Sequence, residues 1–167
     1  MMVAYALYGV AALIVLAPIA IALNGSSRGT GAVYGASLFV TLTLGVIALL
    51  CLFNQPQTSI VTLPLGLPWL GAHFSIDALA AFFLVVVNLG GAAASLFALG
   101  YGRHEDSPQR VLPFYPAYLA AMNLVVMAND AFSFLVSWEF MSLTSWARVV
   151  AHHRVGENVR AGYIYLL

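Results

Sequence analysis

One carboxylate stands in the middle of a segment that is long and apolar enough to cross a membrane. Glu139 is the ninth of the 21 residues from 131 to 151, AFSFLVSWEFMSLTSWARVVA. An acidic side chain at the centre of a membrane helix costs about 2.5 kcal/mol or more, so it is usually retained where a titratable group is needed. We therefore predict that Glu139 transfers protons or handles another cation. The structural alternative is a carboxyl group that hydrogen-bonds to a neighbouring helix with its charge suppressed.

Three other ionisable side chains are secondary candidates. Arg148 follows Glu139 by nine residues, so the two point apart on a helix and cannot pair directly. We expect the guanidinium of Arg148 to extend toward the cytoplasmic end of its helix, with a functional role as the alternative. Asp77 is expected to cap the helix that begins there, with an interfacial ionic role as the alternative. His152 could collect protons near the inner mouth, although a solvated loop is the simpler interpretation.

Composition places the chain in a membrane. Hydrophobic residues make up 62% of it and charged residues 7%, the formal net charge is zero, and lysine is absent. These values are far from those of soluble domains and give no reason to expect nucleic-acid binding. A lone cysteine, Cys51, excludes a disulfide within the chain and argues against a Cys/His metal site. With no phosphate loop, dinucleotide-binding fingerprint or haem motif visible, we expect no bound cofactor, no metal and no electron transfer within the chain.

The sequence predicts an all-α polytopic membrane protein with a single membrane domain. Roughly 20 apolar residues are needed to cross the hydrocarbon core. The N-terminus, MMVAYALYGV, lacks a basic region and is interpreted as a retained first span rather than a cleaved signal. The predicted spans are 3–23, 33–53, 76–101, 113–129 and 131–151, followed at 158–167 by the opening turns of a sixth.

Arginine positions predict the orientation. Cytoplasmic connections carry an excess of basic residues. The connections after the first, third and fifth spans contain arginine, whereas the N-terminus and the other two connections contain none. The N-terminus is therefore expected outside. The arginines in question are Arg28, Arg103, Arg110, Arg154 and Arg160.

The outer connection at 54–75 is rich in proline yet apolar. Alternation around Leu63, Leu65 and Leu67 could form a short hairpin on the outer face. A re-entrant segment is the weaker alternative, because Pro64 and Pro68 interrupt both a helix and a strand ladder.

Small and polar residues inside the spans predict how the helices pack. Small residues spaced four apart allow close approach, and amides inside a bundle form interhelical hydrogen bonds. The fifth span is polar on two sides, since hydroxyl residues lie nearly opposite Glu139, and we expect it to be surrounded by helices. The residues concerned are Gly90, Gly91, Ala94 and Ser95 for packing, Asn88 and Asn123 for hydrogen bonds, and Ser133, Ser137 and Thr144 for the hydroxyl face.

From about residue 73 onward the sequence resembles a known family. The segment NDAFSFLVSWEFMSLTSWARVVAHH, followed by ENVRAGYIYL, is similar to antiporter-like, proton-translocating membrane subunits of respiratory complex I and of group 4 membrane-bound hydrogenases. Within that family the similarity is greatest to the hydrogenase-4 and formate hydrogenlyase type. Supporting pieces are SIDALAAFF around Asp77 and the end of the third span at Tyr101, Gly102 and Arg103.

The resemblance implies roles and partners. It gives Glu139 the part of a glutamate in a proton pathway, whose charge is modulated by a lysine on a later, broken helix. It also implies an outside N-terminus, other membrane subunits and a peripheral hydrogenase or dehydrogenase arm as partners, and the cytoplasmic membrane of a bacterium or archaeon. Two departures stand out: the lysine-bearing helices are absent, and Arg148 occupies a position that is usually apolar.

Three functions are consistent with these observations. The first is a proton-translocating subunit of a membrane oxidoreductase. The second is a subunit of a multi-subunit Na⁺/H⁺ antiporter. The third is a truncated anchor that conducts nothing, because ten residues form only about 15 Å of helix and the predicted sixth span would end inside the bilayer.

Overall fold

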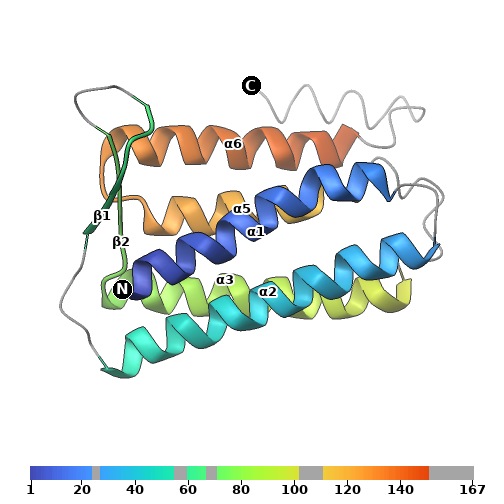
Figure 1. The fold of residues 1–167 in the computed structure, drawn as a ribbon, viewed down its shortest axis with the longest axis horizontal. Helices are drawn as coiled ribbons and strands as arrows, with labels where there is room; N and C mark the ends of the chain where they lie inside the picture. The colour runs from blue at the N-terminus through green and yellow to red at the C-terminus, as the bar shows by residue number, and fades with distance from the viewer. Residues whose placement is uncertain (24–26, 55–59, 67–70, 102–110, 151–167) are drawn as a thin grey trace.

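A computed structural model describes residues 1–23, 27–54, 60–66, 71–101 and 111–150 of the chain. The predicted sixth span and His152 lie outside these residues. Within the described residues, five helices run along the long axis, and each of them runs opposite to the described helix before it (Figure 1). Their bounds are α1 Met2–Ala22, α2 Ser27–Asn54, α3 Ala78–Tyr101, α5 Phe114–Met127 and α6 Ala131–Val149.

Helix α2 begins earlier than the sequence predicted. The predicted start was residue 33, but the helix includes Ser27, so Arg28 lies in its first turn rather than in a connection. Gly29 allows this early start, because a Cβ at that position would lie 2.5 Å from the carbonyl oxygen of Leu23 at the end of α1. The absent side chain lets α2 start directly beside α1.

In the described part of the chain, three helices are long and apolar enough to cross a membrane: α1, α2 and α3. Helix α5 is apolar but has only 14 residues. Helix α6 has 19 residues, but Glu139, Arg148 and several hydroxyl residues lower its hydropathy. The prediction of a largely helical membrane protein is therefore confirmed at the level of three spanning helices, whereas α5 and α6 do not qualify by length and composition alone.

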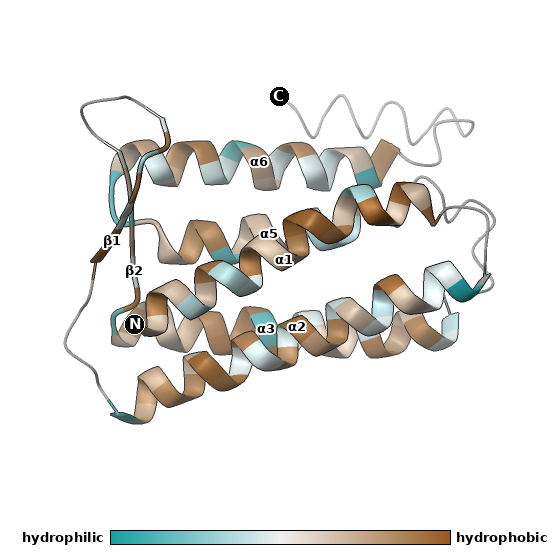
Figure 2. Ribbon diagram, in the orientation of Figure 1, coloured by the Kyte–Doolittle hydropathy of each residue, from teal (hydrophilic) through white to brown (hydrophobic). Residues whose placement is uncertain are grey.

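Large apolar side chains cover the outside of the bundle. Brown, hydrophobic turns predominate on α1 to α3 in Figure 2, and exposed residues include Phe39, Leu89 and Phe97. Soluble proteins rarely expose contiguous apolar surface of this kind. The surface thus suits a hydrocarbon surrounding better than water.

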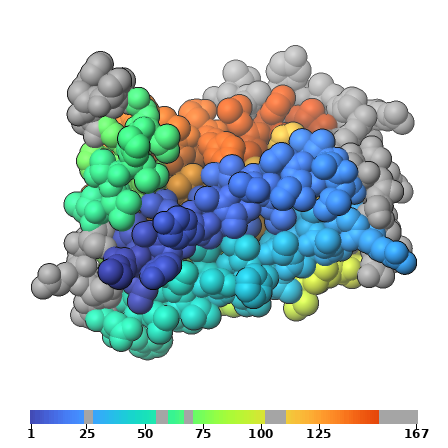
Figure 3. All heavy atoms as spheres, in the orientation of Figure 1, coloured from blue at the N-terminus to red at the C-terminus, as the bar shows by residue number. Residues whose placement is uncertain are grey.

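A β-hairpin closes one end of the bundle. Strand β1, Ile60–Leu63, pairs antiparallel with β2, Ala72–Ser75. The ladder ends at Leu63 because Pro64 follows it, so Leu65 lies in the turn rather than in a strand. Gly66 has a φ of 85°, and a Cβ there would collide with the ring of Phe132. The hairpin therefore packs directly on the start of α6, and its atoms lie beside the start of α1 as well (Figure 3).

Inside the bundle, small residues and paired amides join the helices. Gly91 on α3 is buried, and a Cβ there would lie 3.0 Å from Cδ2 of Leu119 and 3.2 Å from Cγ2 of Thr41. Nδ2 of Asn88 donates to Oδ1 of Asn123 at 2.7 Å across the α3–α5 interface. The predicted interhelical amide bond is confirmed, and so is close packing at Gly91.

We expect Gly91→Val to destabilise the bundle by about 1–3 kcal/mol, because the new methyl groups must displace α3 from α2 and α5. The matched control is Gly90→Val, since a Cβ on Gly90 meets nothing within 4 Å. Thermal unfolding of both variants in detergent measures the difference. Equal melting temperatures would show that the close approach at Gly91 is not needed.

Candidate functional site

Helix α6 has one buried face that packs on α5. Ser133, Ser137 and Thr144 are buried on this face. The hydroxyl of Thr144 donates to the carbonyl oxygens of Phe140 at 2.8 Å and Met141 at 3.0 Å, so it needs no partner on another helix. Hydroxyl groups that satisfy themselves on their own helix can be buried at little cost in an apolar bundle. The hydroxyl face of α6 is thus the face that the fold uses for packing.

Glu139 lies on the other face of α6. Its side chain is exposed, and so are its neighbours Leu135 and Leu143. None of the described helices covers this face. Glu139 is about 13 Å along α6 from the helix start, close to mid-length. The sequence predicted that α6 is surrounded by helices, but in the described residues only its hydroxyl face is covered.

Arg148 is turned inward instead of toward the helix end. Its guanidinium carbon lies 5.5 Å from the ring centroid of Tyr115 and 5.1 Å from that of Tyr118, both on α5. Such distances are typical of cation–π contacts. The extended side chain that we expected for Arg148 is therefore not observed, because the two rings offer it an attractive site within the bundle.

Further polar contacts lie beside Arg148 and at mid-bundle. The hydroxyls of Ser95 and Tyr115 are 2.7 Å apart, and Tyr115 also donates to the carbonyl oxygen of Gly91 at 3.0 Å. The pair Asn88 and Asn123 lies one layer further along, about 10 Å away by helical rise from Ser95 to Asn88. These buried polar groups are paired with one another, as an apolar surrounding requires.

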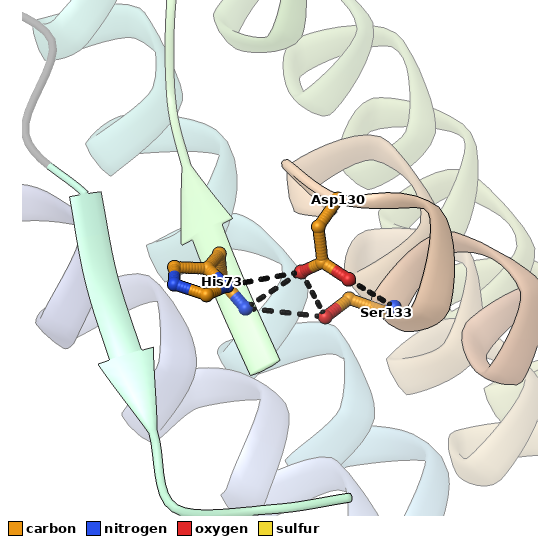
Figure 4. Close-up of polar contacts among 3 residues, drawn as sticks. All are labelled: His73, Asp130 and Ser133. Carbon is orange, nitrogen blue, oxygen red and sulfur yellow. Dashed lines mark hydrogen bonds and ion pairs between the residues drawn. The ribbon is translucent and has the colours of Figure 1, made fainter. Parts of the chain in front are cut away.

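A cluster of three residues joins the hairpin to α6, as Figure 4 shows. Oδ2 of Asp130 accepts hydrogen bonds from the backbone N–H of His73 at 2.8 Å and from the hydroxyl of Ser133 at 2.6 Å. Oδ1 accepts from the backbone N–H of Ser133 at 2.8 Å. Nδ1 of His73 lies 3.5 Å from Oδ2 of Asp130. We call His73, Asp130 and Ser133 the clasp.

The contacts of the clasp hold the hairpin to α6 and do not form a catalytic arrangement. The Ser133 hydroxyl donates to the carboxylate of Asp130 and not to the imidazole. A carboxylate with a lowered pKa is a weak base, so it does not activate this hydroxyl as a nucleophile. Partial burial acts to raise the pKa of Asp130, but the hydrogen bonds from Ser133 and His73 and the His73 charge outweigh it and lower this pKa to about 2. The carboxylate is thereby held in its charged form at the N-terminus of α6, where the helix dipole favours it.

Sequence reasoning missed the clasp. An Asp three residues before a Ser at the start of an apolar helix is a capping signal that could have pointed to Asp130. Nothing in the sequence connects His73 to it, since the two are 57 residues apart.

Asp77 is the helix cap that the sequence predicted. Its Oδ1 accepts from the backbone N–H of Ala80 at 2.7 Å, and its carbonyl oxygen accepts from Ala81 at 2.8 Å. Asp77 is exposed at the hairpin end of the bundle, and Glu139 is near the middle of a different helix.

The structure brings Arg148 to the tyrosines of α5 but does not bring Glu139, Asp77 and Arg148 together.

We expect Asp130→Asn to remove an acid-dependent part of the stability. The lowered pKa means that the ionised Asp130 stabilises the fold fully above about pH 4, and that this contribution is lost as the pH falls through about 2. Asparagine caps a helix about as well as aspartate, so the variant isolates the charge. Melting temperatures between pH 6 and pH 2 should fall more steeply in the unaltered protein than in the variant, and parallel curves would contradict the assignment.

Curated relatives match part of this chain. An uncharacterized protein of Mycobacterium tuberculosis is 31% identical over 99 residues, which are 59% of this chain and 16% of the relative. Hydrogenase-4 component B of Escherichia coli is 33% identical over 92 residues, 54% of this chain and 14% of the relative. A protein of Staphylococcus saprophyticus described as an antiporter subunit is 26% identical over 98 residues, 55% of this chain and 12% of the relative. No family model matches the chain.

A solved structure shares the fold. A chain of the membrane-bound sulfane sulfur reductase, an archaeal respiratory membrane complex, superposes with a TM-score of 0.70 and 20% identity over 99% of this chain and 32% of that chain. The matched part of this chain covers 16% or less of the length of the curated relatives named above. Over the matched part it is homologous to hydrogenase-4 component B and to an antiporter subunit, which confirms the resemblance to antiporter-like membrane subunits.

Proposed function

We propose that the protein is a proton-translocating membrane subunit that couples electron transfer in partner proteins to proton movement through Glu139. The observation that carries the proposal is the position of this carboxylate, near the middle of α6 on a face that the described helices leave uncovered. A charge at that depth needs a partner. The partial homology to hydrogenase-4 component B supports the same assignment.

The membrane arrangement belongs to this proposal. In it α5 and α6 complete five spans with α1 to α3, the hairpin end faces outward, and the ends of α1 and α6 face the cytoplasm of a bacterium or archaeon. Glu139 lies between two charged ends, with Asp130 outside and Arg148 inside. A covering helix from another membrane subunit or from further chain would hold the cation that modulates Glu139, and a peripheral hydrogenase or dehydrogenase arm would supply the energy.

In the proposed mechanism, Glu139 gains a proton when the modulating cation is distant and releases it when the cation approaches. A nearby positive charge favours the carboxylate, and its removal from a desolvated site favours the neutral acid. Protons would reach and leave the carboxylate along water and side chains, with no cofactor at the site. Asp77, Arg148 and His152 are not assigned a direct role in the transfer.

We expect Glu139→Gln to reduce proton translocation by about 100-fold, the lower end of what a positioned proton-transfer group contributes. Proton uptake by membrane vesicles, driven by the electron donor of the intact complex and followed with a pH-sensitive dye, measures this. Electron transfer itself is recorded in the same vesicles, together with the amount of assembled protein. The matched control is Ser142→Ala, which removes a small polar group one turn away on the same helix.

Measurements on the same vesicles distinguish two other functions. The homology to an antiporter subunit favours cation/proton exchange, in which case a sodium gradient alone would move protons in vesicles without any electron donor. If Glu139→Gln assembles and pumps at the normal rate, the proposed role of Glu139 is wrong. If a sodium gradient also moves no protons, a non-conducting anchor is the remaining interpretation.

A further inference from the structure

Arg148 carries a positive charge that the described part of the chain does not neutralise. It forms no ion pair with Asp77, Asp130 or Glu139, and its Nε is buried with no hydrogen-bond acceptor among the described residues. The two tyrosine rings attract the guanidinium but cannot cancel its charge. A buried donor without an acceptor is costly. Among the described residues, the site therefore offers Arg148 no anionic partner.

A cavity extends from Arg148 along the bundle. Its volume is about 290 Å³, and it lies between α3 and α5, with Arg148 and Tyr118 among its lining residues. The remaining wall is mostly apolar or small: Val86, Gly90 and Ala94 on α3, and Leu119 and Met122 on α5. Gly90 and Ala94 are exposed, so the cavity opens to the side of the bundle.

The cavity is polar at one end and apolar along its length. Arg148 lies in the last turn of α6, and Tyr118 in the first turns of α5, at the same end of the bundle (Figure 1). From there the wall runs along α3 from Ala94 to Val86, about 12 Å toward the middle of the helix. An amphiphile with an anionic head and a hydrocarbon tail matches this distribution.

We propose that this cavity binds an anionic phospholipid, with the phosphate on the guanidinium of Arg148 and one acyl chain along Val86, Gly90 and Ala94. Arginine donates paired hydrogen bonds to phosphate, and basic pockets between membrane helices on the cytoplasmic side suit acidic head groups. A net negative head group balances the charge of Arg148, whereas a zwitterionic one brings a second cation. The tyrosine rings that could hold a choline group are already occupied by Arg148.

The size of the cavity suits an acyl chain. A helix is at least 10 Å across, so it could lie over the groove but could not enter a space of about 290 Å³. A single acyl chain is far thinner and fits the space. The proposal rests on the membrane orientation given under the proposed function, but it does not depend on the role of Glu139.

Lipid titration of the full chain, purified in detergent and followed by native mass spectrometry, tests the proposal. Phosphatidylglycerol should bind more tightly than phosphatidylcholine, and Arg148→Gln should weaken phosphatidylglycerol binding by about tenfold. Arg28→Gln is the matched control, because Arg28 is an exposed arginine at the same end of the bundle and outside the cavity. Gly90→Leu should weaken binding to a similar extent, because it fills the apolar wall and leaves the charge in place.

Each arm can overturn the proposal. Unchanged phosphatidylglycerol binding in both Arg148→Gln and Gly90→Leu would rule the site out. If glycerol phosphate binds as tightly as phosphatidylglycerol, the site takes a free anion and the acyl-chain assignment is wrong. If Arg148→Gln fails to fold, Gly90→Leu alone decides, since a Cβ at residue 90 meets nothing within 4 Å. If Arg148→Gln loses a co-purifying subunit but still binds lipid, the partner of Arg148 is a carboxylate of that subunit and not a lipid.

Discussion

The packing of the hydroxyl face of α6 against α5 is the constraint on which the arrangement of charges depends. Nine residues of an α-helix are two and a half turns, so Glu139 and Arg148 must lie on opposite faces whichever way the helix is rotated. Burial of Ser133, Ser137 and Thr144 selects one rotation. That rotation sends Arg148 onto the tyrosines of α5 and leaves Glu139 on the uncovered side.

The rest of the bundle supports this rotation at both ends. The clasp holds the first turn of α6 to the hairpin through the Asp130 carboxylate, and the contacts of Arg148 hold its last turn to α5. Between them, α5 is fixed to α3 by the Asn88–Asn123 bond and by close packing at Gly91. In an apolar surrounding such polar contacts are retained because the alternative is an unsatisfied group. The orientation of Glu139 is therefore set by contacts that Glu139 does not itself make.

Much of the fold could be predicted because it follows from local chemistry. The helix starting after Asp77 has its capping residue in the sequence, and the amides Asn88 and Asn123 each had to find a partner once buried in a span. The earlier start of α2 escaped prediction because it depends on the contact between Gly29 and the end of α1. The contact of Arg148 with the tyrosines was not predicted either. Until α5 is placed, its guanidinium can equally well extend to the helix end or stack on a tyrosine ring.

The sequence by itself determined the mid-helix position of Glu139, the apolar character of α1 to α3 and the opposition of Glu139 and Arg148, since hydropathy and helical period are local properties. Tertiary structure alone decided which side of α6 is covered, that the carboxylate of Asp130 receives the backbone of His73 from 57 residues away, and that a cavity leads away from Arg148. The physical reason is that these features arise between helices. Each depends on the rotation and separation of two elements, and no single segment carries that information.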